Sequence, residues 1–573
     1  MMQCRPTVLQ GLVTLCVLTL LTLSGCGGGG GGDDGDNQPP PGDFLLFYGD
    51  NDNVAGDGLF KIQDDNLVPV KKINFSGQSR IQSFAPFGDK TIFVACDNRG
   101  CEPWITDGTT GGTQIVRDIN PGPGDSNPQD FLLFAESLFF TAFDPIDGRE
   151  LWRTDGTEAG TVRVANIGIE NPLSPSTPQS SNPGDLTVFK GALFFSADTG
   201  PYAPNPNRYG RELWKTDGTE IGTVLVKNIG ADDIQQTFNG DPRGLTVYNN
   251  YLYFSADDGP FAVTRYGREL WKTDGTETGT ILVKNIGIDP DDPNRAYDGA
   301  PQEFIVFDNA LYFFADNGTN GFEPWKTDGT EAATSLVRNL GDDSISPSPA
   351  TADDLSYWTE FNNQLYLAAG ELWKTDGTEA GTTLVTDIND TVLSVVANRD
   401  DVFEVFNGQL LFFADDGENG FEPWVTDGSP EGTALLEAIW SGNQPITASN
   451  LRMLTIFNGL LYFSAENGTS GVEIFVTDGV VTNGTDAKLL YDPNRDETGI
   501  APGSDSGYRD HFGPNSLNGV LYFSAYNGVN RNGVEIWKSA GLGIDNWRSS
   551  NQAGAVVRLV EDLNLGPPDG ALP

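Results

Sequence analysis

The sequence predicts an all-β protein built from about ten four-stranded antiparallel units, and three observations support that fold class. First, a phrase of the form Arg-Glu-Leu-Trp-Lys-Thr-Asp-Gly-Thr recurs along the chain, most clearly in residues 211–223 and 268–280. Second, each repeat contains four short runs rich in Val, Phe, Tyr, Leu and Thr, separated by turn residues. Third, no stretch after the N-terminal segment has the sustained 3.6-residue apolar period of a helix.

One aromatic residue in the third run marks each unit, and successive markers stand 44 to 62 residues apart. The markers are Phe60, Trp104, Trp152, Trp214, Trp271, Trp325, Trp373, Trp424, Phe475 and Trp537. Four-stranded antiparallel units repeated at such a period are typical of a β-propeller. We therefore predict one large ring of about ten units, with two smaller rings as the alternative. The markers are interpreted as core wedges between adjacent sheets rather than as a ligand site.

Within a unit, the first two strands are predicted to be joined by a tight turn such as Asn407-Gly408 or Asn458-Gly459, which tolerates the positive φ angles of a type I′ hairpin. The third strand carries the aromatic marker, and an Asp-Gly turn leads into the fourth. The turn aspartates are Asp107, Asp155, Asp217, Asp274, Asp328, Asp376, Asp427 and Asp478. Aspartate in a turn accepts nearby backbone N–H groups, so we interpret these residues as structural. The first unit, residues 44–73, lacks its opening strand.

The pattern Glu-Leu-Trp-x-x-Asp-Gly-Thr resembles the bacterial ELWxxDGT repeat family, whose members are often described as hyalin-repeat-like surface proteins. The resemblance covers nearly all of the chain after its N-terminal segment, and it implies a secreted or surface-attached repeat protein without established catalytic residues. Residues 315–325 and 414–424 also resemble, more distantly, the tryptophan-docking motif of quinoprotein propellers. That second resemblance implies the same blade structure and no quinone cofactor.

The N-terminal residues resemble a lipoprotein signal. Arg5 is followed by an apolar stretch over residues 8–23 that ends in Leu-Ser-Gly-Cys at Cys26. The resemblance implies cleavage before Cys26, attachment of membrane lipid to Cys26, and, because Gly27 follows, export to the outer membrane of a bacterial cell envelope, facing the periplasm or the cell surface. An uncleaved membrane helix is the alternative.

This interpretation divides the chain into four parts. Residues 1–25 form the signal peptide, 26–43 a Gly/Asp/Pro-rich tether, 44–566 the propeller repeats and 567–573 a C-terminal tail. Cys96 and Cys101 flank a four-residue turn, and in an exported protein they are expected to form a disulfide. The formal net charge of −46 argues against nucleic-acid binding and favours cations or basic partners.

The connections between strands two and three, and between strand four and the next unit, vary in length, whereas the other turns stay short. In a meandering unit both variable classes lie at the same face, which is usually the binding face. The candidate binding residues in these loops are Tyr202, Tyr209, Tyr266, Tyr297 and Tyr508. Asp289, Asp291 and Asp292 are the candidate ligands for Ca²⁺, and no other cofactor is indicated.

The sequence offers little for catalysis, because His511 is the only histidine and no GxSxG, P-loop or CxxC motif is present. We therefore predict a non-catalytic, lipid-anchored envelope propeller that binds a protein or glycan partner through the variable-loop face. The alternatives are an envelope assembly scaffold like the quinoprotein-type propeller lipoproteins, and a carbohydrate-active enzyme that uses paired carboxylates.

Overall fold

The residues described by a computed structural model form β-strands and one short 3₁₀ helix, η1 (Leu340–Asp342). It describes residues 44–51, 54–63, 66–74, 79–168, 178–200, 209–230, 238–259, 265–292, 297–342, 355–388, 403–418, 420–439, 452–466, 472–481, 487–491, 515–517, 520–526, 534–540 and 557–561. The proposed signal peptide, tether and tail lie outside these residues, as does Cys26. None of the described segments forms a helix with the length and apolar character needed to cross a membrane.

The described strands form ten sheets. The first has three strands, β1 (Leu45–Asn51), β2 (Val54–Gln63) and β3 (Asn66–Lys72), and the other nine have four each. In chain order these nine are β4 (Gln82–Phe87), β5 (Lys90–Asp97), β6 (Gly100–Thr106) and β7 (Gln114–Ile115); β8 (Gln129–Phe134), β9 (Ser137–Asp144), β10 (Gly148–Thr154) and β11 (Val162–Arg163); β12 (Gly184–Phe189), β13 (Ala192–Asp198), β14 (Arg211–Thr216) and β15 (Val224–Lys227); β16 (Arg243–Tyr248), β17 (Tyr251–Asp257), β18 (Arg268–Thr273) and β19 (Ile281–Lys284); β20 (Gln302–Phe307), β21 (Ala310–Asp316), β22 (Phe322–Thr327) and β23 (Ser335–Leu336); β24 (Leu355–Phe361), β25 (Gln364–Ala369), β26 (Glu371–Thr375) and β27 (Thr383–Thr386); β28 (Phe403–Phe406), β29 (Gln409–Asp415), β30 (Phe421–Thr426) and β31 (Ala434–Leu435); β32 (Arg452–Phe457), β33 (Leu460–Glu466), β34 (Val472–Thr477) and β35 (Ala487–Tyr491); β36 (Asn515–Leu517), β37 (Val520–Tyr526), β38 (Val534–Ala540) and β39 (Val557–Glu561).

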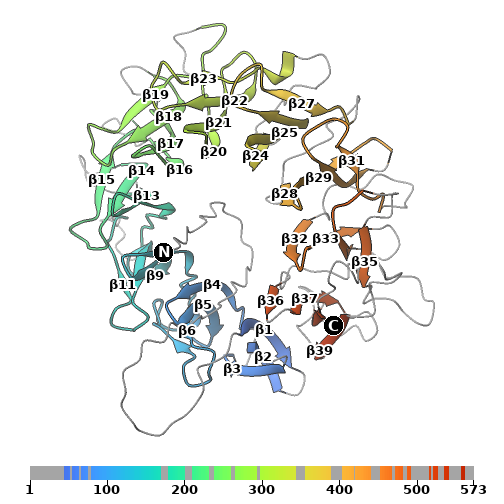
Figure 1. The fold of residues 1–573 in the computed structure, drawn as a ribbon. Helices are drawn as coiled ribbons and strands as arrows, with labels where there is room; N and C mark the ends of the chain where they lie inside the picture. Colours follow the sequence, from blue (N-terminus) through green and yellow to red (C-terminus); the bar gives the residue numbers. More distant parts are fainter. Residues whose placement is uncertain are drawn as a thin grey trace, which may run out of the picture.

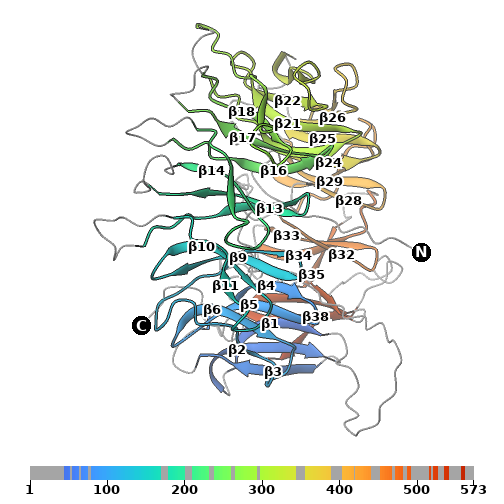
Figure 2. The same cartoon turned by 90° about the vertical axis from the view of Figure 1, so that its left-hand side faces the viewer.

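Every pairing is antiparallel between strands that follow one another in the chain, so each sheet is a simple meander. The prediction of an all-β protein made of four-stranded antiparallel units is confirmed. The sheets succeed one another around a central space, with the first strand of each four-stranded sheet nearest the centre (Figure 1). Figure 2 shows the same arrangement from the side. The last strand of the first sheet, β3, contacts the last strand of the final sheet, β39.

The turns between first and second strands require left-handed backbone. Asn407 and Gly408 have φ angles of 51° and 77°, and Asn458 and Gly459 have 51° and 74°. Positive φ at both central residues is the requirement of a type I′ hairpin, whose twist matches that of the flanking strands. These Asn-Gly pairs therefore set the register of their hairpins.

The apolar core lies between neighbouring sheets. In one cluster, Phe314 of β21 packs with Leu340, Leu367 and Trp373, so that residues of two consecutive sheets share one core. Each sheet is thus stabilised by burying both faces against its neighbours, as the repeat pattern requires.

Besides the shared apolar core, a hydrogen bond from a lysine in the third strand of one sheet to a turn glycine of the next forms a joint between adjacent sheets. The Lys272 ammonium group of β18 donates a hydrogen bond to the Gly329 carbonyl oxygen in the turn of the next sheet, at 2.7 Å. Gly329 has φ +98°, and a Cβ placed there would lie 2.1 Å from the hydroxyl oxygen of Tyr253. Glycine is therefore needed both for the backbone conformation and for the close approach of the neighbouring ring. The same bond recurs from Lys215 to Gly275, Lys326 to Gly377 and Lys374 to Gly428.

Candidate functional site

The aromatic markers lie in the core between sheets. Trp104, Trp152, Trp271, Trp325 and Trp373 are buried, as are Phe60 and Phe475, whereas Trp214 and Trp424 are half-buried. The side chain of Trp537 lies outside the described part. The indole N–H groups of the seven described tryptophan markers have no hydrogen-bond partner. Their environment is thus that of packed rings, and it presents no polar ligand site.

The Asp-Gly-Thr segment forms a turn closed by its own hydrogen bonds. Asp274 Oδ1 accepts the backbone N–H of Thr276 at 2.8 Å and its hydroxyl at 2.7 Å, while Thr273 Oγ1 accepts the Gly275 N–H at 2.9 Å. These bonds, first the one from the Thr276 hydroxyl, lower the pKa of Asp274. One carboxylate oxygen, Oδ1, is thus engaged within its own turn, which agrees with the structural role. The same Asp-to-Thr or Asp-to-Ser bond is formed by Asp107, Asp155, Asp217, Asp328, Asp376 and Asp427, and Asp478 accepts the N–H of Val480.

The glutamate that begins the recurring phrase has a role that sequence reasoning did not assign. Glu269 is fully buried, and its carboxylate accepts the backbone N–H groups of Ile286 at 2.8 Å, Gly287 at 2.8 Å and Gly299 at 3.3 Å. It therefore fastens both ends of the long connection between β19 and β20. Burial raises the pKa of Glu269 well above its usual range, opposed by these bonds.

The same bond, to an N–H seventeen residues downstream, is formed by Glu102, Glu150, Glu212, Glu323 and Glu371. The sequence signal for this role is a glutamate two residues before the aromatic marker, present in every unit but the first, which has Gly58 there. The partner seventeen residues downstream is likewise a recurring aliphatic residue: Ile119, Ile167, Ile229, Ile286, Leu340 or Ile388.

A pocket of about 690 Å³ lies beside the connection between β19 and β20, whose two ends are bonded to Glu269. It is lined by Phe238, Asp257, Gly259, Arg265, Gly267, Tyr297, Asp298, Ala300 and Phe322. Phe238 belongs to the connection between β15 and β16, three residues to the connection between β17 and β18, and three to that between β19 and β20. The pocket is therefore built mainly from the variable connections, with strand ends completing it.

The backbone holds the two carboxylates of the pocket in place. Asp257 ends β17, lies opposite Arg268 in the ladder and accepts the Gly259 N–H at 2.8 Å. Asp298 Oδ1 accepts the Arg268 N–H at 3.0 Å, and the residue remains exposed. Both side chains thus have a fixed position and still present carboxylate oxygen to the pocket.

One aromatic ring of the pocket is anchored by a hydrogen bond. The Tyr297 hydroxyl donates to Asp316 Oδ2 at 2.9 Å, and this bond, together with burial, raises the pKa of Tyr297. Gly267 permits the close packing beneath, because it has φ +85° and a Cβ there would lie 2.5 Å from Asp298 Oδ1. A side chain at Gly267 would therefore displace Asp298 or fill part of the cavity.

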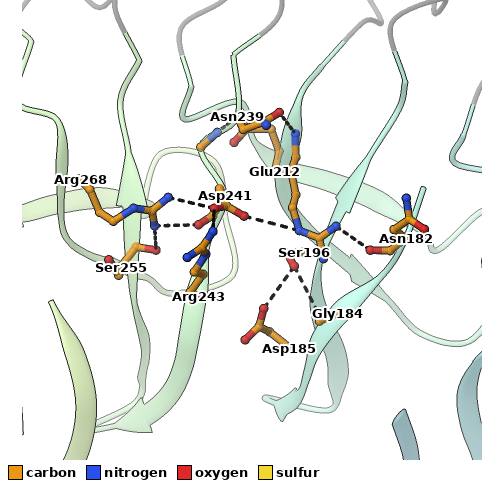
Figure 3. Close-up of polar contacts among 12 residues, drawn as sticks. Asn182, Gly184, Asp185, Ser196, Glu212, Asn239, Asp241, Arg243, Ser255 and Arg268 are labelled. Atoms are coloured by element: carbon orange, nitrogen blue, oxygen red, sulfur yellow. Dashed lines mark hydrogen bonds and ion pairs between the residues drawn. The ribbon is translucent and has the colours of Figure 1, made fainter. Parts of the chain in front are cut away.

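Beside the pocket, three arginines surround one aspartate (Figure 3). Asp241 lies 2.5 Å from the guanidinium of Arg243, 3.1 Å from that of Arg268 and 3.6 Å from that of Arg211. Burial lowers the pKa of Arg268, and the nearby Asp241 opposes that shift. The cluster links the sheet that contains Arg211 to the sheet that contains Arg243 and Arg268. Arg268 directly follows Gly267, and its backbone N–H donates to Asp298.

The residues predicted from the sequence divide as follows. Tyr297 lines the pocket, whereas Tyr209 and Tyr266 do not; their backbone N–H groups bond to Thr199 and Asp258. Tyr202 and Tyr508 lie outside the described residues, as does His511. Asp289 is buried and accepts the N–H groups of Asp291 and Asp292, which makes it a turn residue. Within the described ranges, no group of three or more His, Cys, Asp or Glu side chains could hold a metal ion.

Cys96 and Cys101 are joined by a disulfide across the hairpin of β5 and β6, where they lie opposite each other. Both are buried, and Phe131 packs against them. The disulfide therefore closes one hairpin end and is remote in sequence from the pocket.

No family model matches the chain, and no curated protein matches it. Similar solved structures are a puromycin hydrolase, at 12% identity and a TM-score of 0.30 over 73% of this chain and 55% of that chain; a mutant of puromycin hydrolase complexed with PGG, at 12% identity and 0.29 over 72% and 58%; and one from a study of two prolyl endopeptidases, at 11% and 0.31 over 72% and 54%. This chain spans little more than half the length of each. The likeness to the ELWxxDGT family is untested by these comparisons and stays a prediction.

These neighbours contradict the predicted function. A non-catalytic propeller that binds a protein or glycan partner was expected, whereas the similar solved structures are named as a hydrolase and endopeptidases. That prediction is therefore not carried forward. At TM-scores near 0.3 the likeness also assigns no activity to this chain, so that it concerns the all-β fold alone.

Proposed function

We propose that the protein binds a small organic amine in the pocket between the sheet β16–β19 and the sheet β20–β23. The observation that carries this proposal is the pocket lining, in which three aromatic rings, Phe238, Tyr297 and Phe322, stand with the carboxylates of Asp257 and Asp298. Aromatic faces and carboxylates together favour an organic cation, with each cation–π contact contributing about 0.5 to 2 kcal/mol. The volume of about 690 Å³ suits a small molecule.

The charge of the protein supports the same choice of ligand. With a formal net charge of −46, its field attracts cations and repels anions. Arg265 is the one basic residue of the pocket lining, and it is exposed, so water screens its charge. Among the lining residues the two carboxylates exceed Arg265 by one charge, and the Arg268 guanidinium beside them is itself paired with Asp241.

Calorimetric titration of the full chain with agmatine tests the proposal. We expect saturable binding that weakens at least tenfold in Asp298→Asn, because the isosteric amide keeps the bond to Arg268 N–H and loses only the charge. Asp257→Asn should weaken it similarly. Asp198→Asn is the matched control, because Asp198 has the place of Asp257 in the preceding sheet, opposite Arg211, and does not line the pocket. Equal binding of an uncharged analogue of agmatine would contradict the proposal.

We also propose that the ten sheets close into one β-propeller ring. The contact between β3 and β39 supports this closure, as does the succession of sheets around a common centre (Figure 1). Solution X-ray scattering from residues 44–573 tests it: a single ring predicts one compact particle with a central minimum in density, whereas two smaller rings predict an elongated, two-lobed particle.

We propose, finally, that Cys26 carries a lipid that anchors the protein to the bacterial envelope. The support is the apolar stretch over residues 8–23 followed by Leu-Ser-Gly-Cys. Radiolabelled palmitate should enter the wild-type protein and be absent from Cys26→Ala. A Cys26→Ala protein that stays membrane-bound to the same extent would favour an uncleaved helix instead.

A further inference from the structure

The pocket lining contains one basic side chain, Arg265, for which a ligand that is only an amine has no use. Within the described ranges Arg265 forms no ion pair, whereas the three arginines beside the pocket all share Asp241. A guanidinium group has five N–H donors in a planar fork and no acceptor, and its preferred partner is a carboxylate or a phosphate. The pocket therefore offers an anion-binding group as well as two carboxylates.

The connection between β17 and β18 brings Arg265 close to the carboxylate of Asp257. Asp257 and Arg265 lie toward opposite ends of this connection, and the carboxylate of Asp258 fastens those ends together. It accepts the backbone N–H groups of Tyr266 at 2.9 Å and of Gly267 at 3.0 Å. Burial raises the pKa of Asp258, and the charge of Arg265 opposes that shift, so the guanidinium lies within electrostatic range of this turn. Charges of both signs are therefore fixed on one connection of the pocket.

The connection between β19 and β20 supplies the second carboxylate and a fixed ring. Asp298 follows Tyr297, whose hydroxyl donates to Asp316. Phe238 and Phe322 add two apolar rings to the lining. A guanidinium or ammonium group at Asp298 thus has an aromatic face beside it, and the other rings suit an aliphatic chain.

We propose that the ligand is a free basic amino acid such as arginine, whose two cationic groups bind Asp257 and Asp298 and whose carboxylate binds Arg265. This inference rests on the proposed amine site and defines its ligand. Each charged group of the pocket then has one partner of opposite charge on the ligand. The ligand keeps a net positive charge, so the acidic protein still attracts it. Agmatine is arginine without the carboxylate, and it therefore leaves Arg265 without its partner.

Calorimetric titration of the full chain with four related ligands tests this assignment. Arginine should bind about three- to fivefold more tightly than agmatine, the gain expected of one partly exposed ion pair. Nα-acetylarginine lacks the α-ammonium group, and citrulline lacks the side-chain charge. Each should bind about tenfold or more weakly than arginine, because one carboxylate of the pocket loses its charged partner.

The variant Arg265→Gln separates recognition of the carboxylate from the integrity of the pocket. We expect it to bind arginine more weakly than agmatine, because the negative field of the protein then acts on an unpartnered carboxylate. It should bind agmatine more tightly than the wild type does, because a positive charge has been removed from the pocket. A damaged pocket would weaken both ligands and would not reverse their order.

Arg243→Gln is the matched control for the loss of a nearby charge. Arg243 lies beside the pocket at Asp241 (Figure 3), its side chain is 67% exposed, and it does not line the cavity. The preference for arginine over agmatine should persist in this variant. Loss of the preference in Arg243→Gln to the same extent as in Arg265→Gln would overturn the specific role of Arg265.

The remaining outcomes distinguish this inference from the amine site on which it rests. If neither arginine nor agmatine gives saturable binding, both proposals are wrong. If agmatine binds and arginine binds no more tightly, or if the preference for arginine survives in Arg265→Gln, the amine site stands and the assignment of Arg265 is overturned. Equal binding of Nα-acetylarginine and arginine would overturn the free amino acid in favour of the C-terminal arginine of a peptide.

Discussion

Replacing Trp373 by alanine is expected to lower the free energy of unfolding by about 3 to 5 kcal/mol. Trp373 is 1% exposed and packs against Phe314 and Leu340 of the preceding sheet as well as Leu367 of its own. Its removal leaves a cavity between two sheets, which close packing cannot fill without moving both. Urea unfolding followed by circular dichroism measures the loss, and a midpoint close to that of the wild type would exclude the wedge role.

Trp373→Phe is the matched control for this prediction. Phenylalanine already occupies the equivalent position at Phe60 and Phe475, both 6% exposed. The Trp373 indole N–H has no hydrogen-bond partner, so phenylalanine also removes an unpartnered buried donor. We expect a loss of about 1 kcal/mol or less. A loss as large as that of the alanine variant would show that the site needs the full size and shape of the indole, which phenylalanine does not supply.

The free energy of unfolding is expected to fall as the pH rises from about 5 to 8.5. Burial raises the pKa of Glu102 to about 7 and that of Glu150 to about 8, and it raises the pKa of Glu269 well above its usual range. Between the unfolded pKa, about 4.3, and these folded values, the folded state binds more protons than the unfolded state. Stability is therefore greatest below the window and is lost through it, by on the order of 2 to 4 kcal/mol each for Glu102 and Glu150, with a change in the same direction for Glu269.

Thermal melting at pH 5 and pH 8.5, in 0.1 and 1 M NaCl, measures this dependence. The exposed carboxylates also repel one another more at high pH, but 1 M salt shortens the Debye length to about 3 Å and suppresses that contribution. The slope that remains in 1 M salt should be smaller in Glu150→Gln, which has no proton to lose. An unchanged slope in this variant would show that Glu150 is not one of the titrating groups.

How far the sequence predicts the structure depends on the distance over which each signal acts. The Asn-Gly hairpins and Asp-Gly-Thr turns follow from neighbouring residues, because their hydrogen bonds or φ angles are set within a few positions. The wedge role of Trp373 follows from its period along the chain. The role of Glu269 does not follow from neighbouring residues, because its partners Ile286 and Gly299 lie 17 and 30 residues away.

The candidate pocket was even less accessible to sequence reasoning. It combines Phe238, Gly259 and Tyr297 from three connections with two strand ends, Asp257 and Phe322, and their meeting depends on how adjacent sheets are placed. Of the three candidate tyrosines within the described residues, Tyr209, Tyr266 and Tyr297, only Tyr297 lines the cavity. Loop composition identifies a face of the molecule, whereas the packing of one sheet on the next selects the residues that share a site.

The hydrogen bond from Lys272 to the turn glycine of the following sheet has a consequence for how such a chain changes in evolution. Three consecutive units, those of Lys272, Lys326 and Lys374, contain both halves of the joint, since each offers a lysine to the next unit and a glycine to the previous one. Duplicating one unit therefore breaks one joint and creates two of the same kind. Because each unit interacts mainly with its neighbours, copy number can change by single units while the existing contacts are retained.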